Sequence, residues 1–408
     1  MDDDRATVRF IDRMIAEAIA QRASDIHLQP EHDRCRLRLR IDGLLRDAEP
    51  PPNNLTERII ARLKLLAGMD VAERRHPQDG RLQMALGKNQ AAQLRASTCP
   101  ASNGEKLVLR FVEQHGPRDL GELDLPPQVQ HQLETALAQP EGLILVTGPT
   151  GSGKSATLHA ALRHLNTPER NICTVEDPVE ITTPGLTQVG VNRRAELGFP
   201  QALRAFLRQD PDVIMIGEIR DPETATIAVK AAQTGHLVLS TLHTRSAAGA
   251  VERLARMGIA YHDLASSLSL IIAQRLVRCR CQQCNPAPPA ALEWAAAEPA
   301  ADYQVASAHP PPPVTLPAAR PSGAAAAGTS QSTTCCHDGY SGRRAVFEAL
   351  PMLDPIRDAI NAAPTTRELS NHTAQLGLED LASAGMQLVS QGVTTISEIR
   401  RTTWTDWL

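Results

Sequence analysis

The first part of the chain carries two patterns of apolar positions, one helical and one strand-like. Between positions 4 and 20, apolar residues recur at the spacing of a helix that buries one face. The run RCRLRLRID at 34–42 instead alternates strictly, so its arginines share one strand face and its apolar side chains the other. Further strand-like segments lie at 81–86, 93–98 and 107–113. They predict an N-terminal α+β domain over residues 1–113, whose arginine face is either a solvated surface or a binding surface.

Apolar runs of a different kind begin beyond residues 114–127, a linker rich in glycine, proline and charge. Strand-like runs alternate there with helix-like runs, and the strands are apolar throughout rather than on one side. Such strands are typical of a parallel sheet with helices on both faces. The runs are GLILVT, NICTVE, DVIMIGE and HLVLSTLH. The pattern predicts an α/β core over residues 128–278.

The pattern changes again in the last third of the chain. Residues 285–330 are rich in proline and alanine, with HPPPPV and GAAAAGTS, and predict a flexible excursion rather than a packed element. This excursion lies inside a cysteine-bearing segment, 279–343. Helical periodicity returns from Arg344 to Leu408 and predicts a helical C-terminal subdomain.

Composition and charge narrow the class of protein. A chain of 408 residues is too long for one core, so two or three domains are expected. An apolar content of 42% and a net charge of -4 argue against a nucleic-acid binder that depends on bulk positive charge. No apolar run approaches the ~18 residues that cross a bilayer, and the acidic start MDDDRATVRF lacks the apolar segment of a signal peptide. We therefore expect a cytoplasmic protein.

A glycine-rich loop follows the first of the apolar strands. It reads GPTGSGKS and fits GxxxxGK[ST] in full, between a strand and a helix. Its glycines let backbone N–H groups surround a β-phosphate, where the helix start adds positive potential. Lys154 is expected to reach the β- and γ-phosphate oxygens, and the Ser155 hydroxyl to coordinate Mg²⁺. The predicted nucleotide-binding loop comprises Gly148, Pro149, Thr150, Gly151, Ser152, Gly153, Lys154, Ser155 and Ala156.

Acidic residues and histidines flank the other strands of the predicted core. Open α/β folds bind ligands at the carboxyl ends of their strands, and the candidate acids there are Glu176, Asp177, Glu180 and Glu218. Such an acid can hold Mg²⁺ or orient the attacking water, whereas Asp212 begins its strand and is better explained as a cap. His236 and His243 bracket HLVLSTLH. A lone histidine there is more often structural, but two beside a phosphate loop favour γ-phosphate sensing.

Four segments occur in the order found in a known family, which the chain resembles from Ala23 to its C-terminus. They are TGPTGSGKS, TVEDPVE, LRAFLRQDPDVIMIGEIRD and TGHLVLSTLHT, with ASDIHLQP, RLRIDG and ERRHPQDGR upstream and CQQC and GYSGRRAVFE downstream. The family is that of the type II secretion and type IV pilus assembly ATPases. The resemblance implies a RecA-like P-loop ATPase core and a PAS-like N-terminal domain. It further implies a hexameric ring that uses ATP and Mg²⁺ to drive an inner-membrane platform protein and add pilin subunits to a fibre.

The resemblance also assigns roles by position. Lys154 and Ser155 bind the phosphates and Mg²⁺, Glu218 is the Walker B acid at the same metal, and Glu176 orients water. His236 and His243 become the histidines of the last motif.

Two sets of arginines are assigned to the nucleotide by the same resemblance. Arg95 and Arg110 come from the N-terminal domain, and Arg204, Arg208 and Arg220 lie beside the site. Guanidinium groups can stabilise the anionic charge of a transferring phosphoryl group. Each arginine alone is equally well explained as a surface charge.

The eight cysteines favour a metal site over disulfides. Five of them fall in the last third of the chain, as expected for a metal site in a reducing cytosol. A CxxC followed by a second cysteine pair is typical of structural zinc, but Ser332 stands where the family has one cysteine of the second pair. His337 and Cys279 are further candidate ligands, and free thiols in a decayed site are the alternative. The predicted zinc ligands are Cys281, Cys284, Cys335 and Cys336.

Three other functions fit the sequence less well than assembly. A retraction motor of the same superfamily would lack the cysteine pairs, and a nucleic-acid translocase would need a basic channel with stacking aromatics, whereas only 3% of residues are aromatic. A dead scaffold would not keep Lys154, Glu176 and Glu218. No nucleic-acid partner is expected. The protein is expected at the cytoplasmic side of the inner membrane, where a membrane-anchoring protein is a further candidate partner. The extra N-terminal docking domain of many relatives is expected to be missing.

Overall fold

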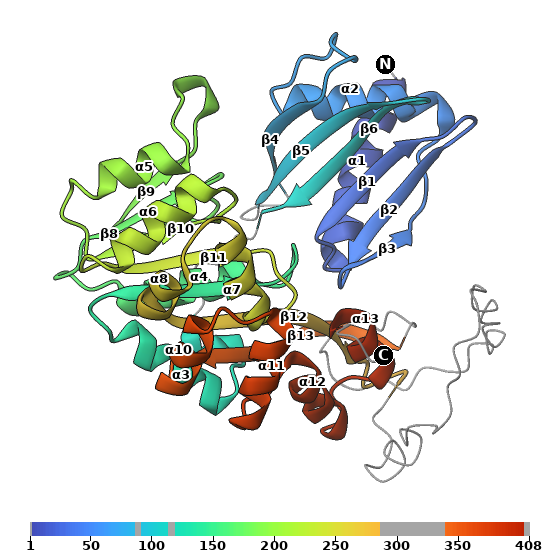
Figure 1. The fold of residues 1–408 in the computed structure, drawn as a ribbon. Coiled ribbons are helices and arrows are strands. Elements are labelled where there is room, and N and C mark those ends of the chain that lie inside the picture. Colours follow the sequence, from blue (N-terminus) through green and yellow to red (C-terminus); the bar gives the residue numbers. More distant parts are fainter. Residues whose placement is uncertain (1, 86–90, 113–118, 286–338, 404–408) are drawn as a thin grey trace.

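The computed structural model describes residues 2–85, 91–112, 119–285 and 339–403, which form two units built on separate sheets (Figure 1). Each unit has its own buried apolar core, and the C-terminal sheet carries one such core on each face. Among these residues, no helix has the length and apolar character that crossing a membrane requires. The coarse prediction of a mixed α/β protein is therefore confirmed.

The N-terminal unit is a six-stranded antiparallel sheet in the order β3-β2-β1-β6-β5-β4. Helices α1 and α2 pack on one face, because their apolar side chains share a core with the alternate strand residues. The opposite face carries the arginines of the alternating run. The elements are α1 (Asp2–Ala20), β1 (Asp25–Pro30), β2 (Cys35–Ile41), β3 (Leu44–Asp47), α2 (Thr56–Leu66), β4 (Gln78–Ala85), β5 (Ala91–Ala101) and β6 (Gly104–Phe111).

The C-terminal unit is a seven-stranded sheet in the order β13-β12-β7-β11-β10-β8-β9. Every neighbouring pair is parallel except β12 with β13. Its central strands are buried on both sides, which is why they read as continuous apolar runs. The strands are β7 (Gly142–Thr147), β8 (Ile172–Glu176), β9 (Leu186–Gly190), β10 (Val213–Ile216), β11 (Leu237–Leu242), β12 (Leu268–Arg280) and β13 (Tyr340–Pro351).

Helices cover both faces of this sheet. One face packs against α3 (Pro127–Leu137) and α4 (Lys154–Leu165). The other packs against the remaining helices, including those of the C-terminal tail. These are α5 (Phe199–Phe206), α6 (Pro222–Ala232), α7 (Ala247–Arg256), α8 (Tyr261–Ser267), α10 (Asp354–Asn361), α11 (Thr366–Gln375), α12 (Leu381–Ser390) and α13 (Ile396–Thr403).

One predicted boundary differs from the structure. The tail was expected to be helical from Arg344, but residues Tyr340–Pro351 form β13, which pairs antiparallel with β12 and completes the core sheet. The helices begin only at Asp354. Pairing with a strand so distant in the chain leaves no local periodic signal, so the sequence alone did not reveal it.

Polar contacts join the two units. The Asp42 carboxylate, in the β2–β3 turn, accepts a hydrogen bond from the backbone N–H of Gly342 at 2.9 Å and lies 3.8 Å from Nε of Arg343. Nearby, Arg22 donates to the Ser341 hydroxyl at 3.2 Å. The N-terminal unit is thus attached to the start of β13.

Candidate nucleotide site

The candidate site lies at the carboxyl edge of the parallel sheet. The glycine-rich loop follows β7, Glu176 ends β8, and Glu218 follows β10 by two residues. His243 follows β11, whose register places Leu242 beside Thr147. Because these strands are parallel, the predicted loop, acids and one histidine reach the same edge, where open α/β sheets bind ligands.

The loop has the backbone that a phosphate cradle needs. Gly148 and Gly153 have φ values of +152° and +92°, a region that side chains rarely adopt. A Cβ at Gly148 would lie 2.4 Å from the Gln274 carbonyl oxygen, so no other residue fits there. Helix α4 starts directly after Gly153 without a side-chain cap, which leaves its first N–H groups for an anion. The Ser152 hydroxyl, 3% exposed, has no hydrogen-bond partner among the described residues, as expected of a group that a phosphate oxygen would satisfy.

Lys154 is held inside this loop. Its side chain is buried, and Nζ donates hydrogen bonds to the carbonyl oxygens of Gly148 at 2.9 Å and Pro149 at 3.0 Å. Burial lowers the pKa of Lys154 to about 8, with Glu218 opposing the shift and Arg275 adding to it. A buried ammonium held only by neutral carbonyls is suited to a phosphate partner.

Glu218 faces the same space and is tied to two basic side chains. Arg220 donates to one carboxylate oxygen, and Nε2 of His243 lies 3.5 Å from the other. Ser155 lies in the first turn of α4 and is exposed. A hydroxyl and a carboxylate are the oxygen ligands that Mg²⁺ prefers, so these side chains fit that metal.

The glutamate that ends β8, Glu176, and the one four residues later, Glu180, have different surroundings. The Glu176 carboxylate is buried and accepts hydrogen bonds from Thr174 at 2.7 Å and Gln188 at 3.0 Å, and Nε2 of His159 lies 3.5 Å away. Burial alone would raise the pKa of Glu176, but these hydrogen bonds outweigh it and hold the pKa below its ordinary value. The Glu176 carboxylate is thus engaged in contacts within the protein.

Glu180 is instead half exposed and faces the N-terminal unit. Its carboxylate forms an ion pair with Arg95 at 3.2 Å, which joins the two units beside the site. A cavity of about 340 Å³ lies here, lined by β4 and β5 on one side and by Val179 and Glu180 on the other. The sequence predicts Glu180 as one candidate acid, whereas the family resemblance assigns the role of orienting water to Glu176.

The predicted arginines do not all reach the edge. Arg95 and Arg110 are register partners on β5 and β6 and share the face that Arg95 uses to meet Glu180. Arg110 donates to Asp25 of its own sheet at 2.7 Å instead.

The second arginine set is also divided. Arg220 lies at the site through Glu218, whereas Arg204 pairs with Glu223 at the start of α6. Arg208 donates to the Arg204 carbonyl oxygen at 2.7 Å. It follows α5 on the approach to β10, towards the opposite edge of the sheet. Within one chain, the structure does not bring Arg208 to the phosphate loop.

His236 also lies away from the loop. It precedes β11, whereas His243 follows it. The two positions are separated by about 23 Å of extended strand, at ~3.3 Å per residue. The His236 ring contacts the Ala231 carbonyl oxygen at 3.1 Å. The prediction that both histidines face the γ-phosphate is therefore not met by His236 within one chain, because a strand separates its two ends.

The cysteine prediction falls mostly outside the described residues. Cys335 and Cys336 lie there, as do Ser332 and His337. Cys281 is buried and Cys284 is exposed. The part of the chain that the structure describes contains no group of three metal-ligating side chains.

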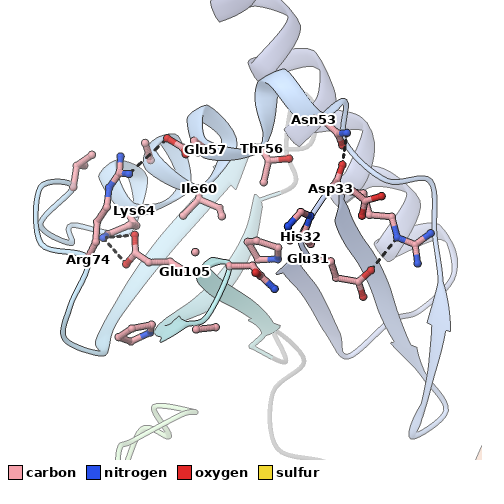
Figure 2. A pocket seen from close by; sticks show the side chains of 18 residues that line it. Glu31, His32, Asp33, Asn53, Thr56, Glu57, Ile60, Lys64, Arg74 and Glu105 are labelled. Atoms are coloured by element: carbon pink, nitrogen blue, oxygen red, sulfur yellow. Dashed lines mark hydrogen bonds and ion pairs between the residues drawn. The ribbon is translucent and has the colours of Figure 1, made fainter.

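A separate cavity of about 370 Å³ lies in the N-terminal unit, between α2, the β1–β2 turn and the β5–β6 turn (Figure 2). Its deepest charges are Lys64 and Glu105, a buried ion pair at 2.8 Å. Glu57 pairs with Arg74 at 3.6 Å at its rim. The lining belongs to this unit alone, so the cavity is not part of the loop edge.

Two buried side chains at the loop were not predicted. Gln274 and Arg275 of β12 contact it, but neither belongs to a pattern whose spacing indicates phosphate binding. Only the register of β12 with β7, which pairs Ala273 with Thr147, places them there.

The chain is similar to several known proteins. The model of a family described as "Type II/IV secretion system protein" matches residues 1–401. The type IV pilus assembly ATPase PilB of Pseudomonas aeruginosa is 41% identical over 404 residues, covering 98% of this chain and 68% of that protein. The protein transport protein HofB homolog of Escherichia coli is 46% identical over 398 residues, covering 96% and 80%. The type II secretion system ATPase E of Vibrio cholerae is 40% identical over 403 residues, covering 98% and 76%.

Solved structures show the same architecture. The crystal structure of the pilus retraction motor PilT with bound ADP aligns with a TM-score of 0.61 at 26% identity, covering 97% of each chain. The ATPase DotB of Legionella pneumophila aligns with a TM-score of 0.67 at 23% identity, covering 96% of this chain and 94% of that one. The likeness to DotB concerns the fold alone.

Proposed function

The chain belongs to the family of type II secretion and type IV pilus assembly ATPases, and we propose that it hydrolyses ATP at the loop edge described above. The observation that supports ATP hydrolysis at this edge is the glycine-rich loop, with Lys154 buried inside it and Glu218 facing it. The protein is an ATPase whose relatives serve secretion and pilus assembly.

Each side chain at this edge has a proposed role. The loop N–H groups and Lys154 bind the phosphates, and Ser155 with Glu218 holds Mg²⁺. When bound, Mg²⁺ neutralises charge on the phosphate oxygens. His243 orients Glu218 from one side and Arg220 from the other, as their contacts indicate.

We assign the second acid to Glu180 in place of Glu176. Glu180 is accessible and lies beside Arg95, whereas Glu176 is occupied by internal hydrogen bonds. Arg95 would then serve both as a partner of Glu180 and as a cation for the nucleotide. Arg110, Arg204, Arg208 and His236 do not face the loop of their own chain, so any nucleotide contact from them requires a domain movement or a neighbouring subunit.

The proposed assembly follows from the family. The chain would form a homohexameric ring at the cytoplasmic face of the inner membrane and act on a platform protein, extending a pseudopilus or a type IV pilus. Relatives that are 40–46% identical carry assembly, secretion or transport names, which favours this reading over retraction. Nucleic acid is not a proposed partner. Zinc at Cys281, Cys284, Cys335 and Cys336 is part of the proposal, and metal analysis of untagged protein tests it.

Substitution of the loop lysine and the Walker B acid tests the function. Lys154→Ala should abolish ATP turnover, because it removes the cation at the phosphates. Glu218→Gln should stop turnover while leaving ADP affinity within about twofold, since it alters the metal site rather than the loop. Glu141→Gln, at the opposite end of β7, is the control and should keep normal turnover. Normal turnover in Lys154→Ala would refute the proposal.

A further inference from the structure

Two consecutive side chains of β12 contact the phosphate loop from opposite faces. Strand β12 pairs with β7 as far as Ala273, opposite Thr147. Gln274 and Arg275 follow at the point where β7 turns into the loop and β12 continues alongside β13. Both side chains are buried, and successive strand residues point to opposite sides of the sheet.

Gln274 contacts the end of the loop and the start of α4. Its amide oxygen accepts a hydrogen bond from the Thr157 hydroxyl at 2.8 Å. Its amide nitrogen lies 2.7 Å from the position that a Cβ at Gly153 would occupy, so the amide rests directly on that glycine. The buried amide thus fixes the backbone immediately before Lys154.

Arg275 contacts the beginning of the loop. Its guanidinium donates to the Gln274 carbonyl oxygen at 2.9 Å and to the Arg245 carbonyl oxygen at 2.5 Å. Its Nη1 lies 3.1 Å from the Cβ position of Gly148. The guanidinium thus links β12 to the segment after β11 and lies against the first glycine of the loop.

The charge of Arg275 is buried without a matching ion pair. Among the described residues, no carboxylate lies within ion-pair distance of its guanidinium, and Glu348 acts on it only from further away. Burying an unpaired cation is costly unless an anion is present nearby when the protein works. The phosphates of a nucleotide bound at the loop would supply such an anion.

We infer that Gln274 and Arg275 are positioning residues for ATP hydrolysis. Gln274 sets the backbone at Gly153 and Thr157, and Arg275 holds the first turn of the loop and places a buried positive charge behind the phosphates. The inference rests on the proposed nucleotide site and adds two residues, outside its motifs, on which the loop geometry depends.

The Gln274 contact is tested by a double-mutant cycle with Thr157. Gln274→Met keeps the shape and removes both polar contacts, and it should lower kcat by ~10- to 100-fold, the scale of a small misplacement of reacting groups. Thr157→Val should lower kcat by a similar factor, and the double variant should have a kcat no lower than that of either single variant. Thr157→Ser keeps the hydroxyl and should therefore keep normal turnover. The exposed Gln233→Met is the matched control. Additive losses in the double variant would overturn the coupling.

The Arg275 contact is tested against another buried arginine on the same strand. Arg275→Met should raise the KM for ATP and the Kd for ADP by at least ~10-fold, because it removes a charge near the phosphates. Arg275→Lys keeps the charge and should recover the ADP affinity but not the full kcat, since an ammonium cannot bridge both carbonyls. Arg278→Met, which breaks an ion pair with Glu398 away from the loop, should lower thermal stability with unchanged KM.

The outcomes separate this inference from the proposed function. If Lys154→Ala is inactive while Gln274→Met and Arg275→Met keep normal kcat and KM, the inference fails and the ATPase site stands. If the β12 variants lose activity only in proportion to their unfolded fraction, as Arg278→Met does, their role is structural and the inference fails. Should Arg275→Met not fold, the KM and kcat of Arg275→Lys decide the question. A normal KM together with a normal kcat in Arg275→Lys would contradict the inference.

Discussion

At the scale of single residues, substitutions of Glu176, which ends β8, and of Glu180 should have opposite effects. Glu176→Gln should lower the free energy of unfolding by about 1–3 kcal/mol. The buried carboxylate accepts several hydrogen bonds, whereas the NH2 group of an amide can only donate. Glu180→Gln should leave stability within about 0.5 kcal/mol, since exposed ion pairs contribute little, but should reduce ATP turnover. Thermal unfolding and ATPase assays on both variants provide the comparison. Loss of turnover with intact stability in Glu176→Gln would return the catalytic role to that residue.

A second prediction for a single residue concerns Gly153, the last glycine of the loop. Gly153→Ala places a side chain at φ +92° and within 2.7 Å of the Gln274 amide nitrogen. This substitution should lower the free energy of unfolding by more than the ~1–2 kcal/mol that a non-glycine residue in the left-handed backbone region costs. It should also weaken ADP binding. Gly258→Ala is the control, with φ +91° and no neighbour within 4 Å. Equal stability losses and unchanged ADP affinity in the two variants would show that Gln274 does not press on the loop.

At the scale of elements, helix α13 is fixed to strand β12 by a buried carboxylate. Glu398 is 1% exposed and accepts hydrogen bonds from Arg278 at 2.9 Å and from Arg401. Burial alone would raise the pKa of Glu398, but the two arginines lower it to about 2. A depressed pKa means that the ionised group stabilises the fold above its unfolded pKa near 4.5 and ceases to do so as the pH falls towards 2.

We therefore expect the stability of the fold to depend on pH through Glu398. Between pH 6 and pH 2.5 the protein should lose up to about 3 kcal/mol of unfolding free energy through Glu398. Glu398→Gln should be less stable at pH 6 and should show a correspondingly smaller fall towards acid. Denaturant unfolding at several pH values measures this difference. Glu379→Gln, a surface substitution in the same region, should keep the wild-type pH dependence, and identical curves for Glu398→Gln would contradict the assignment.

At the scale of the whole molecule, the two units are joined through Asp42. This residue lies in the two-residue β2–β3 turn with φ 47°, followed by Gly43 with φ 87°, so glycine is tolerated in its place. Asp42→Gly removes the carboxylate that accepts from the Gly342 N–H and lies near Arg343. Amide hydrogen exchange at the start of β13 should accelerate by ~10-fold or more, as expected for loss of a hydrogen bond to a charged group.

The remainder of each unit should be unaffected, because each has its own core. Asp124→Gly is the matched control, since Asp124 has a similar φ of 52° and lies outside this contact. Unchanged exchange in Asp42→Gly would show that the contact does not hold the units together.

The N-terminal and C-terminal patterns were predictable for local reasons. Strict alternation in RCRLRLRID reflects a strand with one buried face, and GLILVT reflects one with two. The glycine-rich loop was readable because its function demands particular residues in consecutive positions, between a strand and a helix. These features depend on near neighbours in the chain, so the sequence contains them in full.

Only the tertiary structure decided which of the candidate residues meet. Sheet register brings Gln274 and Arg275 to the loop and carries His236 to the far end of its strand. Packing of α4 and β9 against β8 surrounds Glu176 with hydrogen-bond donors, while the N-terminal unit supplies Arg95 to Glu180. Strand β13 joins the core sheet through a partner on the other side of a long intervening segment. Each of these depends on contacts between residues distant in the chain, which local spacing and motif order do not encode.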